Sequence, residues 1–395
     1  MVDYDPYMPE IKQDPYPIYA RLRAESPVYY VERFDAWALA LFEDIWEASQ
    51  DGEHYSTGNS TADLSFLQRK PSPQETLASI DPPRHDELRT RVFPYFGPKA
   101  ARELEPMMRK WAVECIERHQ PSGRIDAVSE LAQQLAVRIA CTISGFPMRD
   151  ADYLVDIVMR FFLRDEASEG MSEGGHAAQQ EMWEYLARIV RERRDSGERP
   201  PDAMSVLLGE TGEWGEQTLQ KAAEHLTLLM VGATETFPKT FASALLRLWQ
   251  HPDQRRELAN DLSLIPTALK EIFRYDMPTQ WLGRTVIKET EIRAHKLRVG
   301  QPVMFLYPSG NRDEREFDRP DVFDIHRNPE RHLTFGHGIH RCLGAFMATM
   351  EGKVLLEEIL TRFPDYEVLE DELVKPPTEF VQGYSRFPIA FEPVS

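Results

Sequence analysis

The sequence predicts a mainly α-helical fold with a minor β component, in which strands from both ends of the chain come together. Between residues 98 and 257, apolar side chains recur at the three- and four-residue spacing of amphipathic helices. Alternating segments typical of strands occur near the start and again after residue 284. No repeat or linker of different composition divides the 395 residues, of which 42% are hydrophobic, so we expect a single domain over residues 1–395.

The expected elements follow in order along the chain. Residues 14–26 have a helical period, residues 27–32 and 36–42 alternate as in a hairpin, and residues 43–51 return to helix. Central helices are expected at residues 131–143, 152–163 and 179–194, with a Gly-, Ser- and Glu-rich connection at 165–175. The chain then offers a helix at 266–275, strands within 285–313 with turns at 294–295 and 300, an irregular stretch at 312–331 and a last helix at 343–362.

Composition and charge exclude several classes of protein. A net charge of -19 argues against nucleic acid or an anionic membrane as the main partner. The first residues lack the basic start and apolar run of a signal peptide, and the most apolar window, residues 226–233, is too short to span a bilayer. Three cysteines without framework spacing predict no disulfide, so we expect a cytoplasmic location.

The stretch VGATETFPKT, residues 231–240, raises the central question of the sequence. It lies between two apolar helical runs, where a core helix would keep leucine and alanine. Thr236 could cap a new helix with Pro238 in its first turn, where the missing N–H is harmless. Alternatively, one long helix carries polar residues through the centre of the protein. These ten residues alone leave both structures open.

The stretch HLTFGHGIHRCLGAFMATMEG, residues 332–352, is the most informative part of the chain. Gly336 and Gly338 allow a tight loop that brings the backbone close to another group. Cys342 then lies at the start of a helix, where free N–H groups and the helix dipole favour a thiolate. Taken alone, the cysteine could be a small buried residue. A zinc site would need more ligands than His340 and Cys342 supply, and a nucleophile would need a histidine base that the sequence cannot place.

The loop reproduces the pattern FGxGxHxCxG at Phe335, Gly336, Gly338, His340, Cys342 and Gly344. This pattern resembles the heme-binding loop of the cytochrome P-450 family, soluble bacterial class, and the resemblance extends in order over almost the whole chain. It implies the P-450 fold, a helix-rich triangular prism with small sheets formed from both ends of the chain. It also implies heme b (iron protoporphyrin IX) as cofactor, with Cys342 as the proximal iron ligand and Phe335, Gly336 and Gly344 against the heme.

A second motif, IDPPRHDELR, resembles the family's DPPxHxxxR segment. His85 and Arg89 are four residues apart, so they share one face of a helix, and two cationic donors there suit carboxylates. The resemblance assigns these two residues to the heme propionates, together with Arg284 and His340. Without it, they would be read as a solvated basic face.

A third motif, EIFRY, resembles the family's Glu-x-x-Arg pair. Glu271 and Arg274 are three residues apart and can pair along a helix. In the family this pair is joined by an arginine of the later irregular segment, for which Arg327 is the candidate. We expect this network to be structural, because a buried ion network fixes geometry more surely than it adds stability.

Residues 232–236 resemble the family's central helix, which crosses the distal face of the heme. Small residues such as Ala233 let such a helix approach dioxygen, and a hydroxyl beside a carboxylate supports proton delivery. By resemblance Glu235 and Thr236 are this acid–alcohol pair. Phe237 and Pro238 depart from the commonest pattern, and the proline predicts a kink or a widened turn there. Thr349 also departs, since many relatives have arginine at that position.

The resemblance predicts a heme-thiolate monooxygenase that inserts one oxygen atom from O2 into a C–H bond of a small apolar substrate such as a terpenoid, steroid or aromatic. Electrons are expected from a separate ferredoxin or flavodoxin with its reductase, and the protein is expected to be a monomer. The candidate docking patch consists of Arg91, Lys99, Arg331, His337 and Arg341, which could also be a merely solvated charged face. The candidate substrate contacts are Leu64, Phe66, Phe161, Phe162, Leu229, Gln280, Leu282 and Val381.

Two other functions remain open. One is a peroxide-driven heme-thiolate peroxygenase, a class that typically replaces the acid–alcohol pair with arginine and proline, against which Glu235 and Thr236 argue. The other is a heme sensor or binding protein without turnover, which would be expected to carry an output domain that the sequence does not show.

Overall fold

The computed structural model describes residues 2–70, 74–164, 169–209 and 216–393, and helices dominate it. The helices are α1 (Pro9–Gln13), α2 (Tyr16–Glu25), α3 (Phe42–Gln50), α4 (Asp63–Leu67), α5 (Arg84–Val92), α6 (Pro98–His119), α7 (Gln133–Ser144), α8 (Ala151–Phe161), α9 (Glu173–Ser196), α10 (Ala203–Leu208), α11 (Glu216–Gln250), α12 (Pro252–Asn260), α13 (Ile265–Tyr275), α14 (Tyr307–Gly310) and α15 (Ala345–Arg362). The strands are β1 (Val28–Val31), β2 (Ala36–Leu39), β3 (Tyr55–Ser56), β4 (Arg124–Asp126), β5 (Leu282–Val286), β6 (Thr290–Ile292), β7 (His295–Leu297), β8 (Pro302–Phe305), β9 (Glu367–Val368) and β10 (Pro388–Ala390).

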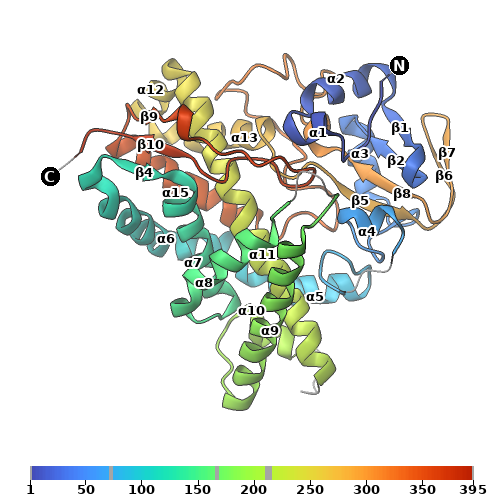
Figure 1. The fold of residues 1–395 in the computed structure, drawn as a ribbon, viewed down its shortest axis with the longest axis horizontal. Coiled ribbons are helices and arrows are strands. Elements are labelled where there is room, and N and C mark those ends of the chain that lie inside the picture. Colours follow the sequence, from blue (N-terminus) through green and yellow to red (C-terminus); the bar gives the residue numbers. More distant parts are fainter. Residues whose placement is uncertain (1, 71–73, 165–168, 210–215, 394–395) are drawn as a thin grey trace.

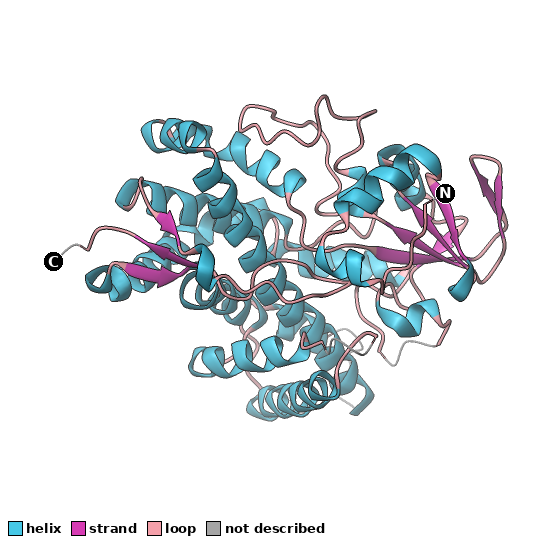
Figure 2. Cartoon of the chain, turned by 45° about the horizontal axis from the view of Figure 1, so that its top comes forward, coloured by secondary structure: helices cyan, strands magenta, loops and turns pink. Residues whose placement is uncertain are grey.

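Strands that lie far apart in the sequence pair with each other, as predicted. In the sheet ordered β1-β2-β8-β5-β3, β2 runs parallel to β8 with Trp37 opposite Val303. In the same sheet, β3 pairs antiparallel with β5, with Tyr55 opposite Val286. A second sheet, β4-β10-β9, joins the middle of the chain to its end. Figure 2 shows the two sheets on opposite sides of the helical body.

The long helix α11 is the central element of the helical body, where it packs against α7, α8 and α9 (Figure 1). VGATETFPKT lies inside it, so the prediction of one long helix is confirmed and the alternative of a helix end at Thr236 is wrong. The helix passes Pro238 without changing its helical type, so the widened turn expected there is absent. A kink at this proline stays a prediction.

Two apolar cores meet along α11. Its first half contributes Leu226 and Met230 to a core shared with α8 and α9. Its second half contributes Phe237 and Phe241 to a core shared with α6, α13 and α15. Between Met230 and Phe237 the helix carries mostly small and polar residues, of which Val231 and Ala233 pack against the first core while only partly buried. A cavity opens at this point.

Several element boundaries differ from the predicted ones, and the short helix α14 lies inside the stretch expected to form strands. The last helix begins at Ala345, because Cys342 and the residues on either side of it belong to the loop. α9 begins at Glu173, where the Ser172 hydroxyl accepts the backbone N–H of Gly175 as an N-cap. The helix therefore takes up part of the connection expected at 165–175, and residues 165–168 lie outside the described residues.

Candidate active site

A cavity of about 350 Å³ lies where α11, β5 and the loop before α15 meet. Each of these three elements contributes both apolar and polar groups to the walls. The walls include Leu228, Leu229, Gly232, Ala233 and Thr236 from α11, Leu282 and Arg284 from β5, and Phe335, Gly336, His340, Cys342 and Gly344 from the loop or the start of α15. The structure thus brings together motifs that are more than a hundred residues apart.

The loop before α15 holds the Cys342 thiol at the cavity wall. Gly336 and Gly338 have φ angles of 65° and 72°, in the left-handed region that favours glycine. A Cβ at Gly338 would also collide with the Ser49 carbonyl oxygen at the end of α3, so the loop rests directly on that helix. The backbone N–H of Cys342 donates to the carbonyl of Phe335 at 2.7 Å, which closes the loop.

The exposed surface of Cys342 faces this cavity. Burial within the protein raises the pKa of the thiol, while the backbone N–H groups of Gly344 and Ala345 and the Arg89 guanidinium act to lower it. A cation or metal in the cavity would favour the thiolate further.

The predicted propionate-binding residues lie close to one another. Arg284 is buried, and its Nη1 donates to the carbonyl of the neighbouring Gly283. Arg89 donates to the Arg341 carbonyl at 2.6 Å. Both guanidinium groups line the cavity without a carboxylate partner among the described residues.

Two histidines, His85 and His340, lie beside these arginines, with ring centroids 4.3 Å apart and ring planes tilted by 52°. His340 lines the cavity, and its Nε2 lies 3.2 Å from the Thr57 hydroxyl. Burial, followed by the charge of Arg284, lowers the pKa of His340 well below its usual range, so the ring is neutral. His85 lies behind it, outside the cavity wall. Its Nδ1 is 2.8 Å from Asp86, and its buried Nε2 has no hydrogen-bond partner within the described part of the chain.

The acid and the alcohol of α11 have different surroundings. Thr236 lines the cavity, and its hydroxyl donates to the Gly232 carbonyl at 3.0 Å. Glu235 is not part of the cavity wall; it is buried and pairs with Lys239, one turn further along the helix. Burial raises the pKa of Glu235, and the charges of Lys239 and Arg164 act to lower it.

The structure brings Glu271, Arg274 and Arg327 together in a buried network. Arg274 donates from Nε and Nη2 to both oxygens of Glu271, at 2.7 and 2.8 Å. Arg327 Nε donates to Glu271 at 3.1 Å. Arg274 also donates to the carbonyl of Asn311, whose side chain accepts the backbone N–H of Leu333. The network therefore connects α13 to the loop that carries the cysteine.

Only part of the predicted substrate set lies at the cavity. Leu229 and Leu282 line it. Gln280 is buried elsewhere and accepts a hydrogen bond from Tyr19, and Phe66 packs against Trp281. The residues that lie outside the cavity wall are Leu64, Phe66, Phe161, Phe162, Gln280 and Val381.

Sequence reasoning missed two residues near the site. Lys239 lies four residues after Glu235, a spacing that pairs opposite charges on one helical face and could have been noticed. Glu351 lines the cavity from α15, and one of its oxygens is buried without a partner among the described residues. The sequence could have revealed Glu351, because this carboxylate lies four residues after Met347 and therefore on the apolar face of the last helix.

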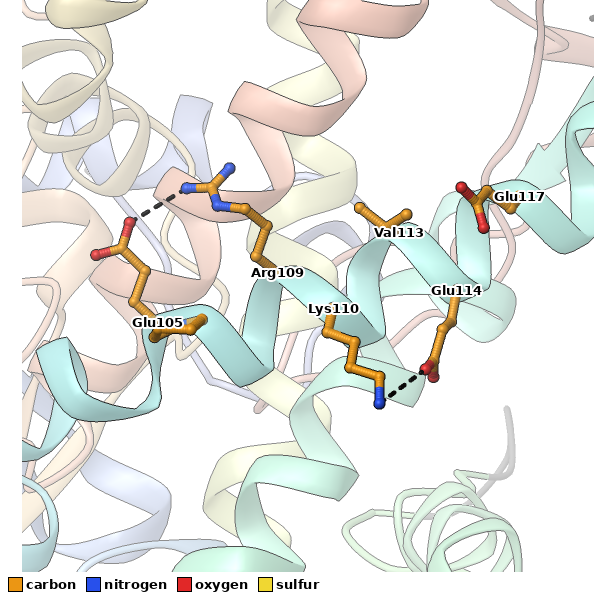
Figure 3. Close-up of a pocket in the computed structure, with 7 residues that line it drawn as sticks. Glu105, Arg109, Lys110, Val113, Glu114 and Glu117 are labelled. Atoms are coloured by element: carbon orange, nitrogen blue, oxygen red, sulfur yellow. Dashed lines mark hydrogen bonds and ion pairs between the residues drawn. The ribbon is translucent and has the colours of Figure 1, made fainter.

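A second depression lies along α6 and is open to solvent (Figure 3). Its charged residues pair along the helix, Glu105 with Arg109 at 3.1 Å and Lys110 with Glu114 at 3.8 Å. Surface pairs of this kind contribute little, and neither cysteine nor histidine lines this depression. We therefore take the cavity at Cys342, and not this depression, as the candidate active site.

The chain is similar to known proteins over nearly its full length. A family model described as Cytochrome P450 matches residues 151–387. Putative cytochrome P450 YjiB of Bacillus subtilis is 30% identical over 367 residues, 90% of each chain. The structure of CYP109E1 from Bacillus megaterium in complex with testosterone superposes with a TM-score of 0.85 at 27% identity, covering 97% of this chain and 99% of that one. P450BioI in complex with a hexadec-9Z-enoic acid ligated acyl carrier protein has the same TM-score at 26% identity and the same coverage.

No helix in the described part of the chain has both the length and the apolar character needed to cross a membrane.

Proposed function

This chain belongs to the cytochrome P450 family, and from that premise we propose that it hydroxylates a small apolar substrate. Members of the family are monooxygenases that carry heme b, so the chain is a heme-dependent oxidoreductase. One observation carries the finer proposal: the Cys342 thiol, the Thr236 hydroxyl and several leucine side chains share a single cavity. A thiolate, a proton-handling hydroxyl and apolar walls are the groups that C–H hydroxylation needs in one place.

The cavity residues fit heme b. A thiol at the wall suits the iron, and within the described residues the buried guanidinium of Arg284 donates only to a carbonyl of its own strand. His85 Nε2 is a buried polar atom still without a partner in the described residues. The buried Arg284 guanidinium requires a further acceptor, which a propionate would supply. When bound, the heme supplies the activation of O2.

We assign the surrounding groups as follows. Cys342 would be the proximal ligand, and Arg89 and Arg284 would offset the charge of the propionates, with the neutral His340, and His85 behind it, beside them. The Thr236 hydroxyl can turn from the Gly232 carbonyl toward the cavity to pass on a proton. The apolar walls exclude bulk water, which strengthens each of these polar interactions.

An apolar substrate agrees with the walls beside α11. Leu228, Leu229, Ala233 and Leu282 contribute apolar walls on this side, and Thr236 and Thr240 contribute hydroxyl groups. The testosterone complex of CYP109E1 supports a steroid or terpenoid. The complex of P450BioI with an acyl-ligated acyl carrier protein supports a long acyl chain as the alternative class of substrate. A panel of steroids, terpenoids, aromatics and fatty acids, followed by the spin-state shift of the ferric protein, would separate these classes.

The electron donor we propose is a separate ferredoxin that docks on the cysteine side of the protein. Arg341 is exposed there, beside exposed Ile339. Two other members of the expected patch are less available, because Arg331 pairs with Glu43 and Glu316 and Lys99 lies 3.8 Å from Glu103. Arg341 is therefore the main cation we expect a ferredoxin carboxylate to meet.

The central test is the absorbance of the reduced protein under carbon monoxide. Thiolate ligation by Cys342 should give the red-shifted Soret band of the family, and Cys342→Ala should abolish it. Product formation with ferredoxin, reductase and NADH should exceed that with peroxide. Activity with peroxide alone would favour the peroxygenase alternative, and a wild type without bound heme would refute the assignment.

A further inference from the structure

A buried histidine of α11 lacks a hydrogen-bond partner among the described residues. His225 is only 2% exposed, and neither its Nδ1 nor its Nε2 meets a donor or acceptor in the part of the chain that the structure describes. Burial, followed by the charge of Arg84, lowers the pKa of His225 to about 4, so the ring is neutral at neutral pH. A neutral imidazole has one N–H that donates and one lone pair that accepts, and leaving both unmet in the interior is unfavourable. The ring therefore offers a donor and an acceptor to a ligand.

His225 lies on the face of α11 that borders the cavity. Residues that follow it by four, seven and eleven positions share its side of the helix, because eleven residues complete about three turns. These residues are Leu229, Gly232 and Thr236, and all three line the cavity. The same spacing places His225 about 16 Å from Thr236 along the helix axis. The imidazole thus continues this row of residues beyond the cavity wall, which begins on α11 at Leu228.

The segment 75–79 adjoins both His225 and the cavity. The charge of Glu75 reaches the imidazole, while Leu77 lines the cavity wall. Leu77 also belongs to the apolar core against which Leu228 packs, so the segment meets the wall where the wall begins on α11. A ligand that extends from the cavity toward His225 therefore meets this segment first.

The polar contacts of this segment are strong within it and weak outside it. Its turn is closed by internal hydrogen bonds, from the Ser79 N–H to the Thr76 carbonyl at 2.8 Å and from the Thr76 N–H to the Ser79 hydroxyl at 2.9 Å. Outside the turn, Glu75 pairs with Arg84 at 2.6 Å and lies 3.8 Å from Lys221, through side chains that are between 34% and 56% exposed. Exposed ion pairs of this kind hold a segment only weakly. A ligand can therefore shift the turn without breaking its internal hydrogen bonds.

We propose that His225 binds an oxygen atom of the substrate, at the end of the molecule remote from the carbon that is hydroxylated. The inference rests on the proposed hydroxylation and narrows its substrate class to a neutral polycycle with a hydroxyl or carbonyl group, such as an oxygenated steroid or diterpenoid. A rigid, elongated skeleton extends along α11 from the Thr236 side of the cavity to the imidazole. The ring N–H donates to a carbonyl oxygen of the substrate, or the ring lone pair accepts from a hydroxyl.

The surroundings of His225 disfavour an anionic or a purely hydrocarbon substrate. A buried carboxylate needs a cation, but the imidazole is neutral and the nearby cations of Arg84 and Lys221 are paired with Glu75. A hydrocarbon would leave both ring nitrogens unmet and would gain no hydrogen bond from His225. The ligand class that satisfies this ring is therefore neutral and oxygenated.

The first arm of the experiment measures the free energy of unfolding of the substrate-free ferric protein in urea. His225→Leu replaces the imidazole by an apolar side chain of similar size and removes both unmet nitrogens, so it should be more stable than the wild type. His225→Gln keeps a donor and an acceptor and should resemble the wild type. His326→Gln is the matched surface control, because the side chain of His326 is 53% exposed, and should change nothing. A His225→Leu protein less stable than the wild type would mean that the imidazole has partners in the folded protein, and would overturn the inference.

The second arm titrates the ferric protein with testosterone and with palmitic acid, and the spin-state shift gives the Kd of each. Testosterone, a neutral steroid with an oxygen at each end, should bind the wild type more tightly than palmitic acid does. His225→Leu should raise the Kd of testosterone roughly 3- to 10-fold, as expected for the loss of one hydrogen bond. His225→Gln should retain most of the affinity, and His326→Gln all of it.

The outcomes separate this inference from the proposed function. A wild type without the thiolate Soret band would refute the function, while the unfolding free energies would still report whether the His225 imidazole is unmet. A wild type that has this band but shows no spin-state shift with testosterone would overturn the inference alone. Equal Kd values for testosterone in the wild type and His225→Leu would also overturn it, since the imidazole would then make no bond to the ligand.

Discussion

At the scale of single residues, neighbours in the sequence can have opposite roles in space. Thr236 borders the cavity, while Glu235, bonded to it along the chain, is buried against Lys239. The motif predicted which residue types occur here but not the direction of each side chain. That direction depends on how α11 is rotated against its neighbours, which residues far away in the sequence determine.

The same distinction explains which site residues could be predicted. The conformations of Gly336 and Gly338 were expected, because a tight loop needs positive φ angles whatever surrounds it. The surroundings of Gln280 were not expected, because its partner Tyr19 is 261 residues away. Local stereochemistry is encoded locally, whereas a hydrogen-bond partner from another segment is known only once the chain is folded.

Glu351 predicts a pH dependence of stability. Burial raises its pKa from 4.5 to about 8. Between these values the folded protein keeps a proton that the unfolded chain has released, so the free energy of unfolding falls as pH rises, by up to roughly 5 kcal/mol. Glu351→Gln cannot ionise, so it should unfold in urea like the wild type near pH 4.5 and be the more stable protein above a pH of about 8.

The exposed Glu103→Gln is the control for this effect, since its side chain is 67% exposed and its removal should leave the pH dependence of the wild type intact. A wild-type stability that stays level over this pH range would show that Glu351 is ionised in the folded protein.

At the scale of elements, long periodic helices were predicted well and their ends less well. The apolar period locates α8 and α9, but the Ser172 cap places the start of α9 at Glu173, before the predicted boundary. Of the strands of the main sheet, β1, β2 and β8 were recognised individually, whereas β3 was not predicted and β5 begins before the predicted stretch. Their order, with β8 between β2 and β5, depends on pairings across most of the chain that no local pattern reports.

The network around Glu271 predicts a large effect on stability. Glu271→Gln leaves the buried Arg274 without its negative partner, which should lower the free energy of unfolding by about 3–5 kcal/mol. Because Arg274 also bonds the carbonyl of Asn311, which holds Leu333, the variant should retain heme less firmly. Urea unfolding and the heme absorbance after gel filtration measure the two effects.

An exposed pair provides the matched control for this change. Asp253→Asn removes the acid of a pair with Arg256 whose side chains are 90% and 63% exposed, so stability should change by less than about 1 kcal/mol. Equal losses in the two variants would mean that the Glu271 network stabilises the protein no more than a surface pair does.

At the scale of the whole molecule, the distribution of charge limits how a redox partner can approach. The net charge is -19, so an acidic ferredoxin is repelled by most of the surface. Productive encounter therefore needs a local cation close to Cys342. Arg341 is exposed next to that cysteine, and its carbonyl is held by Arg89, so its backbone is fixed.

Arg341→Glu should therefore weaken docking. Because Arg341 also lines the cavity and its charge acts to lower the pKa of Cys342, the spectrum of the reduced carbon-monoxide complex is compared with that of the wild type. We expect the ferredoxin concentration at half-maximal rate to rise and the salt dependence of the rate to become shallower, because screening acts on the attraction that is lost. Arg256→Glu makes the same charge change on α12 and should leave both quantities unaltered. If both variants raise the half-maximal concentration equally, overall charge and not the Arg341 site governs docking.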